Sequence, residues 1–299
     1  MVKVVITGSN GLLGQSLLKL LLNEKNAYQV IGFSKGENRS GRDDFEYHSI
    51  DLTDEKLLKK TILQSNPNVI INAAAMTNVD RCEIDKNECD KINVELVKLL
   101  TQVGTQINAH MIHISTDFIF DGKKGNYSET DKPNPLSYYG MSKLKSEQIL
   151  INSKITYTIL RTILVFGKVH AMRRSNIVLW VKDMLERGRE ITMVHDQYRA
   201  PTYVEDLAMA CKISIDRKAQ GIFNISSNQT LSIYKIAQQI AEVFQLNNNL
   251  IKPISTLELD QKAVRPSKTG FDLSNTKRNL GIHAKSFKED LHRFKDSLS

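Results

Sequence analysis

The chain has 299 residues, 41% of them hydrophobic, which is enough for one large or two fused globular units with a real core. Its net charge is +8, but the basic residues are dispersed and no aromatic-basic ladder accompanies them. An anionic small substrate or cofactor is therefore as compatible with the charge as nucleic acid is.

The sequence shows no sign of export or membrane insertion. It contains no apolar run of 18 residues, and its first residues enter a strand pattern directly, so we expect neither a signal peptide nor a membrane span. Cys82, Cys89 and Cys211 form no CxxC pair and suit a reducing compartment, which predicts a cytoplasmic protein. No cluster of His, Cys and Asp has the spacing of a metal site.

Strand-like runs alternate with helical periodicity over about the first 160 residues. The predicted helices cover 11–23, 54–64 and 89–106, and the predicted strands cover 3–7, 28–33, 47–52, 68–74, 109–116 and 156–162. Runs as apolar as 68–74 and 109–116 are typical of strands buried on both faces. This alternation predicts an α/β fold with a doubly wound parallel sheet of the Rossmann kind.

The later third is less regular. It contains predicted helices at 175–188, 202–215 and 232–244, the last with Ser232 at its N-cap, and a strand at 221–226. Because no linker is visible, we expect a smaller C-terminal substrate lobe interleaved with the sheet. The predicted dinucleotide-binding domain is 1–165 with 196–225 returning to it, and the predicted substrate lobe is 166–195 and 226–299.

The stretch "TGSNGLLG" places Gly8, Gly11 and Gly14 at GxxGxxG spacing between a strand and a helix. In a dinucleotide site the first glycine makes the tight turn, the second lets the backbone approach a pyrophosphate, and the third lets helix pack on strand. The helix N-terminus then offers free N–H groups to the phosphates. The position at the start of the chain favours this interpretation over a mere tight turn.

The ends of the next two strands bear on cofactor choice. An acid that grips the ribose is usual after the second strand in NAD-preferring folds, whereas this chain offers Ser34, Lys35 and Arg39. Cations suit a 2′-phosphate, so NADPH is favoured and NADH remains an alternative. Asp51 could accept the adenine amino group, or Asp51 or Thr53 could only cap the following helix.

The stretch "YYGMSK" holds two tyrosines ahead of one lysine. Residues four apart on a helix lie about 40° apart, so Tyr139 shares a face with Lys143, whereas Tyr138 points about 140° away. If the segment is helical, Tyr139 is the tyrosine beside the ammonium.

Several pieces, in order along nearly the whole chain, resemble the extended short-chain dehydrogenases/reductases and, within them, the dTDP-4-dehydrorhamnose reductase family. They are "TGSNGLLGQ", "NAAAMTNVDRCE", "IN" at 92–93, "STDFIFDG", "NPLSYYGMSK", "LRT", "DQYRAPTYVEDLA" and "RP" at 265–266. The resemblance implies NAD(P)H-dependent reduction of the C4 keto group of a dTDP-4-keto-6-deoxy sugar. The expected reaction converts dTDP-4-dehydrorhamnose to dTDP-L-rhamnose for a cell-envelope polysaccharide. The expected partner is the nucleotide sugar, with no nucleic acid or membrane, and a homodimer is compatible.

Reducing a ketone puts negative charge on its oxygen, so a proton donor must lie there. We expect Tyr139 to give the proton, while the Lys143 ammonium and the positive nicotinamide ring lower the pKa of its phenol. The resemblance implies that Lys143 also binds the nicotinamide ribose and that Thr116 positions the carbonyl oxygen, with Ser115 in reserve.

The resemblance also implies the remaining contacts. Those to the cofactor are Gly8, Asn10, Gly11, Leu12, Gly14, Ser34, Lys35, Arg39, Asp51, Leu52, Ala73, Ala74, Ala75, Thr77, Asn93, Ser115, Tyr139 and Lys143. Those to the substrate are Thr77, Val79, Thr116, Asp117, Asn176, Arg199 and Arg265, the last at the diphosphate, where a planar fork suits two oxygens.

Some of these positions have structural alternatives. Thr77 could cap a turn, Asp117 could be structural, and Asn176 could cap a helix. Arg161 could pair with a carboxylate, and His113, in an apolar strand, is interpreted as a core histidine. His195 and Asp196 are expected in the turn that brings Arg199 and Thr202 toward the substrate lobe.

Two departures from the family pattern leave the sugar open. Leu164 stands where the family's reductases carry a tryptophan associated with the sugar, and Phe118 stands where many carry tyrosine. No glutamate follows Asp117, which argues against a 4,6-dehydratase, because elimination of water needs a second acid-base group. The alternatives are a reductase for another nucleotide-linked 4-keto-6-deoxyhexose, or a non-catalytic NADP-binding regulatory subunit resembling that of methionine adenosyltransferase.

Overall fold

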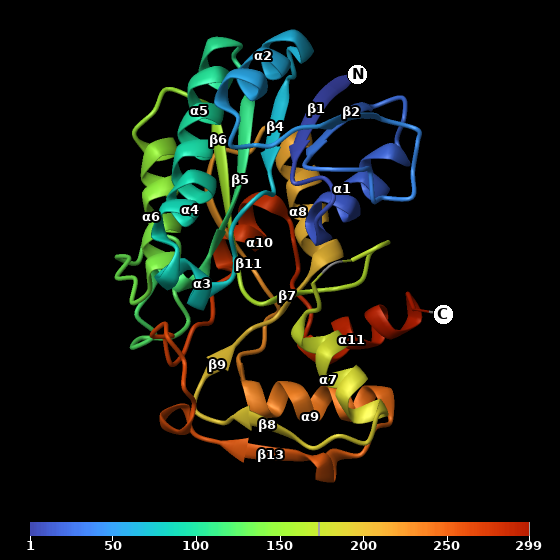
Figure 1. The fold of residues 1–299 in the computed structure, drawn as a ribbon, viewed down its shortest axis with the longest axis vertical. Coiled ribbons are helices and arrows are strands. Elements are labelled where there is room, and N and C mark those ends of the chain that lie inside the picture. The colour runs from blue at the N-terminus through green and yellow to red at the C-terminus, as the bar shows by residue number, and fades with distance from the viewer. Residues whose placement is uncertain (173, 299) are drawn as a thin grey trace.

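The computed structural model in Figure 1 describes residues 1–172 and 174–298. Within those ranges the central feature is a seven-stranded parallel sheet in the order β11-β6-β5-β4-β1-β2-β3. Its strands are β1 (Val2–Thr7), β2 (Tyr28–Ser34), β3 (Glu46–Ser49), β4 (Val69–Asn72), β5 (His110–Thr116), β6 (Tyr157–Thr162) and β11 (Gly221–Ile225). The strand order reverses between β1 and β4, so the predicted doubly wound parallel sheet is confirmed. Ligands of such sheets bind at the carboxyl ends beside this reversal.

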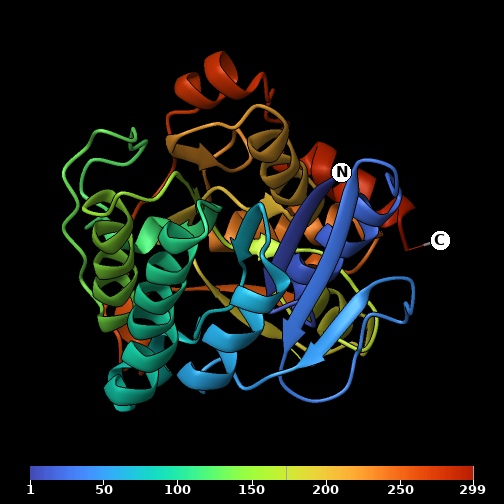
Figure 2. The same cartoon turned by 90° about the horizontal axis from the view of Figure 1, so that it is seen from above.

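Helices cover both faces of the sheet (Figures 1 and 2). On one face α1 (Leu12–Leu22) packs against α8 (Val204–Asp216), and α10 (Ser274–Leu280) lies against β11 and α8. On the other face α2 (Glu55–Ser65), α5 (Leu96–Gln106) and α6 (Tyr138–Ile151) lie side by side. Each face has its own apolar core, because strands such as β4, buried on both sides, present side chains alternately to the two layers.

The predicted helix over 89–106 is interrupted. After α3 (Val79–Ile84), α4 (Lys86–Asp90) runs into a π-helical turn over Lys91–Glu95 before α5 begins. This wide turn carries the buried Asn93, whose side chain bonds the backbone of Met76 at both ends: Met76 N–H donates to Oδ1 at 2.8 Å, and Nδ2 donates to Met76 O at 3.1 Å. Such π turns often mark functional sites.

The lower part of Figure 1 is a smaller lobe. Its helices are α7 (Ile177–Glu186), α9 (Ile233–Phe244) and α11 (Phe287–Asp296), and its strands β8 (Ile191–Val194) and β13 (Ile251–Ile254) pair in parallel. Short pairs join β7 (Val165–Phe166) to β10 (Thr202–Tyr203) and β9 (Tyr198–Arg199) to β12 (Leu231–Ser232). Phe166, Phe287 and Phe294 meet at its core, and the predicted Ser232 cap is confirmed, since its side chain accepts from Lys235 N–H.

Several elements of this lobe and its surroundings have no counterpart among the sequence predictions, namely β8, β13 and α11, helix α10 and the short strands β7, β9 and β12. The predicted helix 202–215 begins two residues later, because Thr202 and Tyr203 pair as β10 with β7. Among residues 1–172 and 174–298, no helix combines the length and the apolar character needed to cross a membrane.

Candidate active site

A cleft of about 620 Å³ opens at the carboxyl ends of the sheet. It lies between the glycine turn after β1, the loop after β4, the end of β5, the first turns of α6 and the loop before α7. The predicted site residues that line it are Asn10, Gly11, Leu12, Arg39, Ala73, Ala74, Ala75, Thr77, Val79, Ser115, Thr116, Asp117, Tyr139, Lys143, Asn176 and Arg265. The fold thus brings together residues as far apart in the sequence as Asn10 and Arg265, and most of the residues that the sequence singled out.

The glycine turn has the geometry expected of it. Gly8 has φ +72°, and a Cβ on Gly14 would lie 2.3 Å from the carbonyl oxygen of Gly8, so α1 packs directly on the turn. Gly11 stands at the N-cap of α1 without a side-chain cap, and it faces the cleft. The free N–H groups of this 11-residue helix therefore point toward the cleft. Gly8 and Gly14 shape the turn from beneath and do not line the cleft.

At the other side of the cleft, Tyr139 and Lys143 lie one helical turn apart on α6, and both are buried. Ser137 caps this helix by accepting from Gly140 N–H. Thr116 ends β5 beside them, and its hydroxyl donates to Asp117 Oδ1 at 3.1 Å. The Ser115 hydroxyl is buried at the same edge, with no hydrogen-bond partner within the described chain. Hydroxyl, phenol and ammonium therefore converge on one wall of the cleft.

The expected acidity of Tyr139 is not produced by the protein's own residues. Burial raises the pKa of Tyr139 above its ordinary value, and the neighbouring Thr116 hydroxyl offsets this only in part. Burial also lowers the pKa of Lys143 to about 8. Within the chain itself, burial outweighs any effect of the Lys143 ammonium on this phenol, because both groups lose their solvation together; the other expected source of acidity is the positive nicotinamide ring.

The two tyrosines are separated as the helical geometry predicts. Tyr138 lies outside the cleft, where its hydroxyl donates to Asp90 Oδ2 at 2.8 Å and its ring lies under the ammonium groups of Lys86 and Lys145. Its backbone N–H donates to Glu83 Oε1 at 2.6 Å. Tyr138 thus anchors α6 to α3 and α4, and only Tyr139 faces the cleft.

The residues predicted at the adenosine end are placed differently from expectation. Lys35 and Asp51 form an exposed ion pair of 2.6 Å, so each engages the other. Asp51 also accepts from Thr53 N–H, while the cap of α2 is Asp54 rather than Asp51 or Thr53. Neither Lys35 nor Asp51 lines the cleft, and the same is true of the neighbouring Ser34 and Leu52. Ser34 supports the glycine turn instead, by accepting from Asn10 N–H at 3.3 Å.

Of the two basic residues predicted at the adenosine end, Lys35 and Arg39, it is Arg39 that lines the cleft. Its N–H donates to Asn10 Oδ1 at 2.8 Å, and its guanidinium spans to Ala171 O in the loop before α7 at 3.4 Å. The loop is further tied down by Gln15, whose side chain donates to His170 O at 3.0 Å.

Arg199 and Asn93, both predicted at the ligands, do not line the cleft. The Arg199 guanidinium is buried and donates to the carbonyl oxygens of Tyr198 at 2.7 Å and Pro266 at 2.8 Å. Its Nε lies 3.8 Å from Asp117 Oδ2, and this cation partly offsets the burial that raises the pKa of Asp117. Arg199 therefore holds two backbone segments and a buried carboxylate, while Asn93 holds the loop after β4 through Met76.

Three of the structural alternatives correspond to what the structure shows. Arg161 forms a buried bidentate pair with Glu147, at 2.7 and 3.0 Å. Asn176 caps α7 by accepting from Leu179 N–H, although it also lines the cleft. His113 is fully buried in β5, and Asp196 holds Thr256 rather than facing the cleft. Thr202 is buried too, and its hydroxyl donates to Ile225 O.

Two charged residues at the site, Asp80 and Arg174, were missed, and Arg174 lines the cleft. Asp80, on α3, binds Arg265 with 2.7 and 3.2 Å contacts and accepts from Ala263 N–H at 3.0 Å. His113 Nε2 lies 3.1 Å from Lys143 Nζ. No sequence pattern indicated a role for Asp80, whereas His113 lies on the same strand face as Ser115, two residues further along β5.

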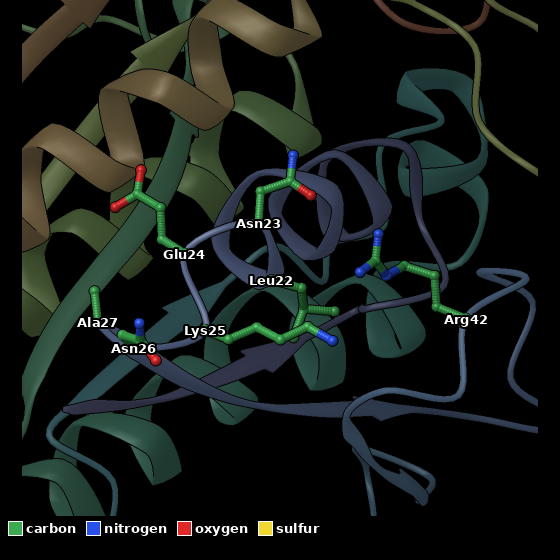
Figure 3. Close-up of a pocket in the computed structure, with 7 residues that line it drawn as sticks. All are labelled: Leu22, Asn23, Glu24, Lys25, Asn26, Ala27 and Arg42. Carbon is green, nitrogen blue, oxygen red and sulfur yellow. The ribbon is translucent and has the colours of Figure 1, made fainter.

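A second hollow lies away from this cleft, at the turn between α1 and β2 (Figure 3). It is lined by Leu22–Ala27 and Arg42, and none of the predicted site residues is among them. Across the described ranges, no group of three or more His, Cys, Asp and Glu side chains could hold a metal ion.

Comparison with known proteins extends over the full length. A family model described as the RmlD substrate binding domain matches residues 2–299. The dTDP-4-dehydrorhamnose reductase of Aggregatibacter actinomycetemcomitans is 31% identical, over 97% of this chain and 97% of its own length. Methionine adenosyltransferase 2 subunit beta of Bos taurus is 30% identical, over 94% of this chain and 83% of its own length.

Solved structures give the same picture. A dTDP-4-dehydrorhamnose reductase from Clostridium acetobutylicum ATCC 824 superposes with a TM-score of 0.88 at 30% identity, covering 99% of both chains. A dTDP-4-dehydrorhamnose reductase from Bacillus anthracis str. Ames, solved in complex with NADP, has a TM-score of 0.88 at 28% identity, again over 99% of both chains.

Proposed function

Because the chain belongs to the RmlD substrate-binding-domain family, we propose that it is an NAD(P)H-dependent oxidoreductase that reduces the C4 keto group of a dTDP-4-keto-6-deoxy sugar. This membership confirms the family resemblance of the sequence. The substrate that fits best is dTDP-4-dehydrorhamnose, giving dTDP-L-rhamnose. The observation that carries the proposal is the convergence of Thr116, Tyr139 and Lys143 on the cleft that the glycine turn also borders.

The cleft suits a dinucleotide on physical grounds. The uncapped N-terminus of α1 offers N–H donors for a pyrophosphate, with Gly11 leaving room for its approach. Arg39 offers a cation for a 2′-phosphate, which favours NADPH over NADH. The unpaired Ser115 hydroxyl, buried at the cleft edge, leaves one polar group available to a bound molecule. The reduced nicotinamide would supply the hydride.

Proton delivery falls to Tyr139. Burial raises the pKa of this phenol, so it is protonated at neutral pH, the form in which it can donate to the developing alkoxide. Thr116 would turn its hydroxyl from Asp117 toward the carbonyl oxygen, and Lys143 would hold the ribose while stabilising the tyrosinate left behind. Asp117, Thr77, Val79, Asn176 and Arg265 would surround the sugar nucleotide.

The proposal also divides the chain between its ligands. Residues 1–165 and 196–225 would bind the dinucleotide, and 166–195 and 226–299 would bind the sugar nucleotide. The packing of α8 on α1 supports the return of the first segment to the sheet. Helix α10, within the second segment, also lies against β11, so the two parts interleave. A cytoplasmic location suits the nucleotide substrates and the three unpaired, buried cysteines.

The test is turnover: purified protein, NADPH and enzymatically made dTDP-4-dehydrorhamnose, followed at the absorbance band of the reduced nicotinamide. Tyr139→Phe should lower kcat by about 10²- to 10⁴-fold, the usual contribution of general acid catalysis, while NADPH still binds. Tyr138→Phe is the matched control: it loses the bond to Asp90 and some stability, but kcat should stay within about threefold because a surface hydrogen bond contributes little. Equal losses in both variants would contradict the assignment.

A second candidate follows from the 30% identity to methionine adenosyltransferase 2 subunit beta. In that case the chain would bind NADP and serve as a regulatory subunit without reducing a sugar. Tight NADP binding without consumption of NADPH on any keto-sugar would favour it. Consumption of NADPH with another nucleotide-linked 4-keto-6-deoxyhexose but not with dTDP-4-dehydrorhamnose, or an alcohol product of the other configuration at C4, would instead indicate another 4-keto-6-deoxyhexose reductase, which Leu164 in the cleft keeps open.

A further inference from the structure

Strand β5 carries two buried histidines with different surroundings. His110 Nε2 lies 2.8 Å from the hydroxyl of Thr158, far from the cleft. His113 is fully buried and contacts three side chains: its Nε2 lies 3.1 Å from Lys143 Nζ and 2.9 Å from Ser146 Oγ, and its Nδ1 lies 3.2 Å from the amide of Asn72. Across the described chain, His113 is the one hydrogen-bond partner of Lys143 Nζ.

The chemistry of the lysine fixes the state of the imidazole. A lysine ammonium has three donors and no acceptor, so a contact of 3.1 Å is favourable only when Nε2 is unprotonated. The imidazole is neutral, because burial and the Lys143 charge hold the pKa of His113 well below its ordinary value. Its single proton must therefore be on Nδ1. In the structure the amide nitrogen of Asn72 lies at Nδ1, and the amide oxygen accepts from the Thr7 hydroxyl at 2.6 Å. The contact with the ammonium requires the reverse orientation of this amide, with its oxygen at the Nδ1 proton and its nitrogen donating to Thr7 Oγ1, because a proton on Nε2 would oppose the ammonium.

We propose that His113 is a positioning residue for Lys143: its Nε2 accepts a hydrogen bond from the ammonium and so fixes Nζ at the wall of the cleft. The inference rests on the proposed function, because it gives a task to the lysine of that site. His113 does not line the cleft, so it acts through Lys143 alone. Asn72 and Thr7, whose side chains are bonded to each other at 2.6 Å, hold the imidazole from its far side.

The contact matters because the ammonium has so little other support. Burial lowers the pKa of Lys143 to about 8, and the groups that act against this are Glu147, one turn further along α6, and Cys89, on α4. Glu147 is already committed to Arg161. Tyr139, on the cleft side, is a neutral phenol until it gives up its proton. Removing the imidazole acceptor should therefore lower the pKa of Lys143 further and release its side chain.

The experiment compares three variants with the unchanged protein. His113→Leu removes the acceptor, His113→Gln keeps an acceptor in its amide oxygen, and His110→Leu removes a buried histidine hydrogen bond from the same strand without touching Lys143. For His113→Leu we expect kcat/KM to fall about tenfold or more, since a hydrogen bond to a charged group is lost, and the alkaline limb of the pH profile to move down by about one unit. His113→Gln should retain activity within about threefold, and His110→Leu should lower the melting temperature without moving the limb.

Two further measurements do not need turnover. The affinity for NADPH should weaken in His113→Leu more than in His110→Leu, because Lys143 binds the ribose. Long-range ¹H–¹⁵N spectra of the unchanged protein at pH 6.5, with His113 assigned from the spectrum of His113→Gln, should show a neutral ring protonated on Nδ1.

A proton on Nε2, or an alkaline limb and NADPH affinity that shift equally in His113→Leu and His110→Leu, would overturn the inference. If His113→Leu fails to fold, two measurements still test the inference: the tautomer of His113 in the unchanged protein and the pH profile of His113→Gln. Absence of turnover in the unchanged protein would refute the proposed function, and the NADPH affinities and the tautomer would then decide the role of His113 separately.

Discussion

The contact between Asp80 and Arg265 joins helix α3 of the sheet domain to the loop 263–265 of the smaller lobe, and we expect it to control binding of the nucleotide sugar. A guanidinium has five N–H donors. Nη1 uses two of them, on Asp80 Oδ1 and Ala263 O, and Nη2 uses one, on Asp80 Oδ2. The two donors left, on Nη2 and Nε, share one edge of the fork. If Arg265 binds the diphosphate as proposed, Asp80 would hold the guanidinium so that this edge stays free for two of its oxygens.

The perturbation is Asp80→Asn, which removes the charge but keeps one oxygen for Ala263 N–H. The side chains of Asp80 and Arg265 are 36% and 17% exposed, so their pair has a strength between those of surface and buried pairs. Its loss should cost about 1 kcal/mol, which corresponds to about a fivefold rise in KM for the nucleotide sugar, with kcat nearly unchanged. Arg265 lowers the pKa of Asp80, so the carboxylate stays ionised and the KM ratio should be constant between pH 6 and 8.

The assay is steady-state NADPH oxidation with the nucleotide sugar varied. Asp183→Asn is the matched control, because Asp183 forms a 2.7 Å pair with Arg187 on the exposed side of α7, away from the cleft. A KM that is unchanged in Asp80→Asn would refute the positioning role. A KM that falls would show that Asp80 competes with the diphosphate for the arginine rather than presenting it.

Three further predictions concern stability and specificity. Glu147→Gln should lower the free energy of unfolding by about 3–5 kcal/mol in urea titrations, because Arg161 is left buried without its carboxylate; a loss below 1 kcal/mol would contradict this. Burial raises the pKa of Asp290 to about 6, so the folded state binds this proton more tightly than the unfolded state and stability is lost as pH rises from about 4 to 6. Asp290→Asn should therefore gain about 1–2 kcal/mol at pH 8 and almost nothing at pH 4, and an equal effect at both pH values would exclude the titration as the cause. Leu164→Trp, at a cleft position with φ +43°, should change the ratio of kcat/KM between two epimeric keto-sugars about tenfold or more, as pocket contacts do; an unchanged ratio would remove Leu164 from specificity.

Features that depend on neighbours in sequence were predictable. The glycine spacing, the one-turn separation of Tyr139 from Lys143, and the Ser232 cap each need only a few residues of local geometry, and the structure has them all. The sheet was predictable as well, because strands buried on both faces are apolar along their whole length.

Features set by competition between distant groups were not predictable. Lys35 was predicted to be available to a phosphate, but in the structure it forms an ion pair with Asp51, its neighbour across the sheet edge. The burial that raises the pKa of Tyr139 was not predictable either, because the sequence identifies the lysine one turn away but not the side chains that pack around the phenol. Lys35 and Asp51 are 16 residues apart, and Tyr139 is buried by contacts on every side. A local sequence pattern reports neither.

Family resemblance identified positions near the site without telling a contact from a support. Arg265 and Arg199 were both expected at the substrate, yet one lines the cleft while the other is buried against backbone carbonyls. What distinguishes them is burial, because the Arg265 side chain is 17% exposed at the cleft whereas that of Arg199 is 4% exposed. His113 is the converse case: alternation along β5 places it on the same face as Ser115, but only the packing of α6 on that face puts a lysine within reach. Whether a buried polar residue contributes to the chemistry therefore depends on which helix covers its strand, and this follows from topology rather than from the residues on either side.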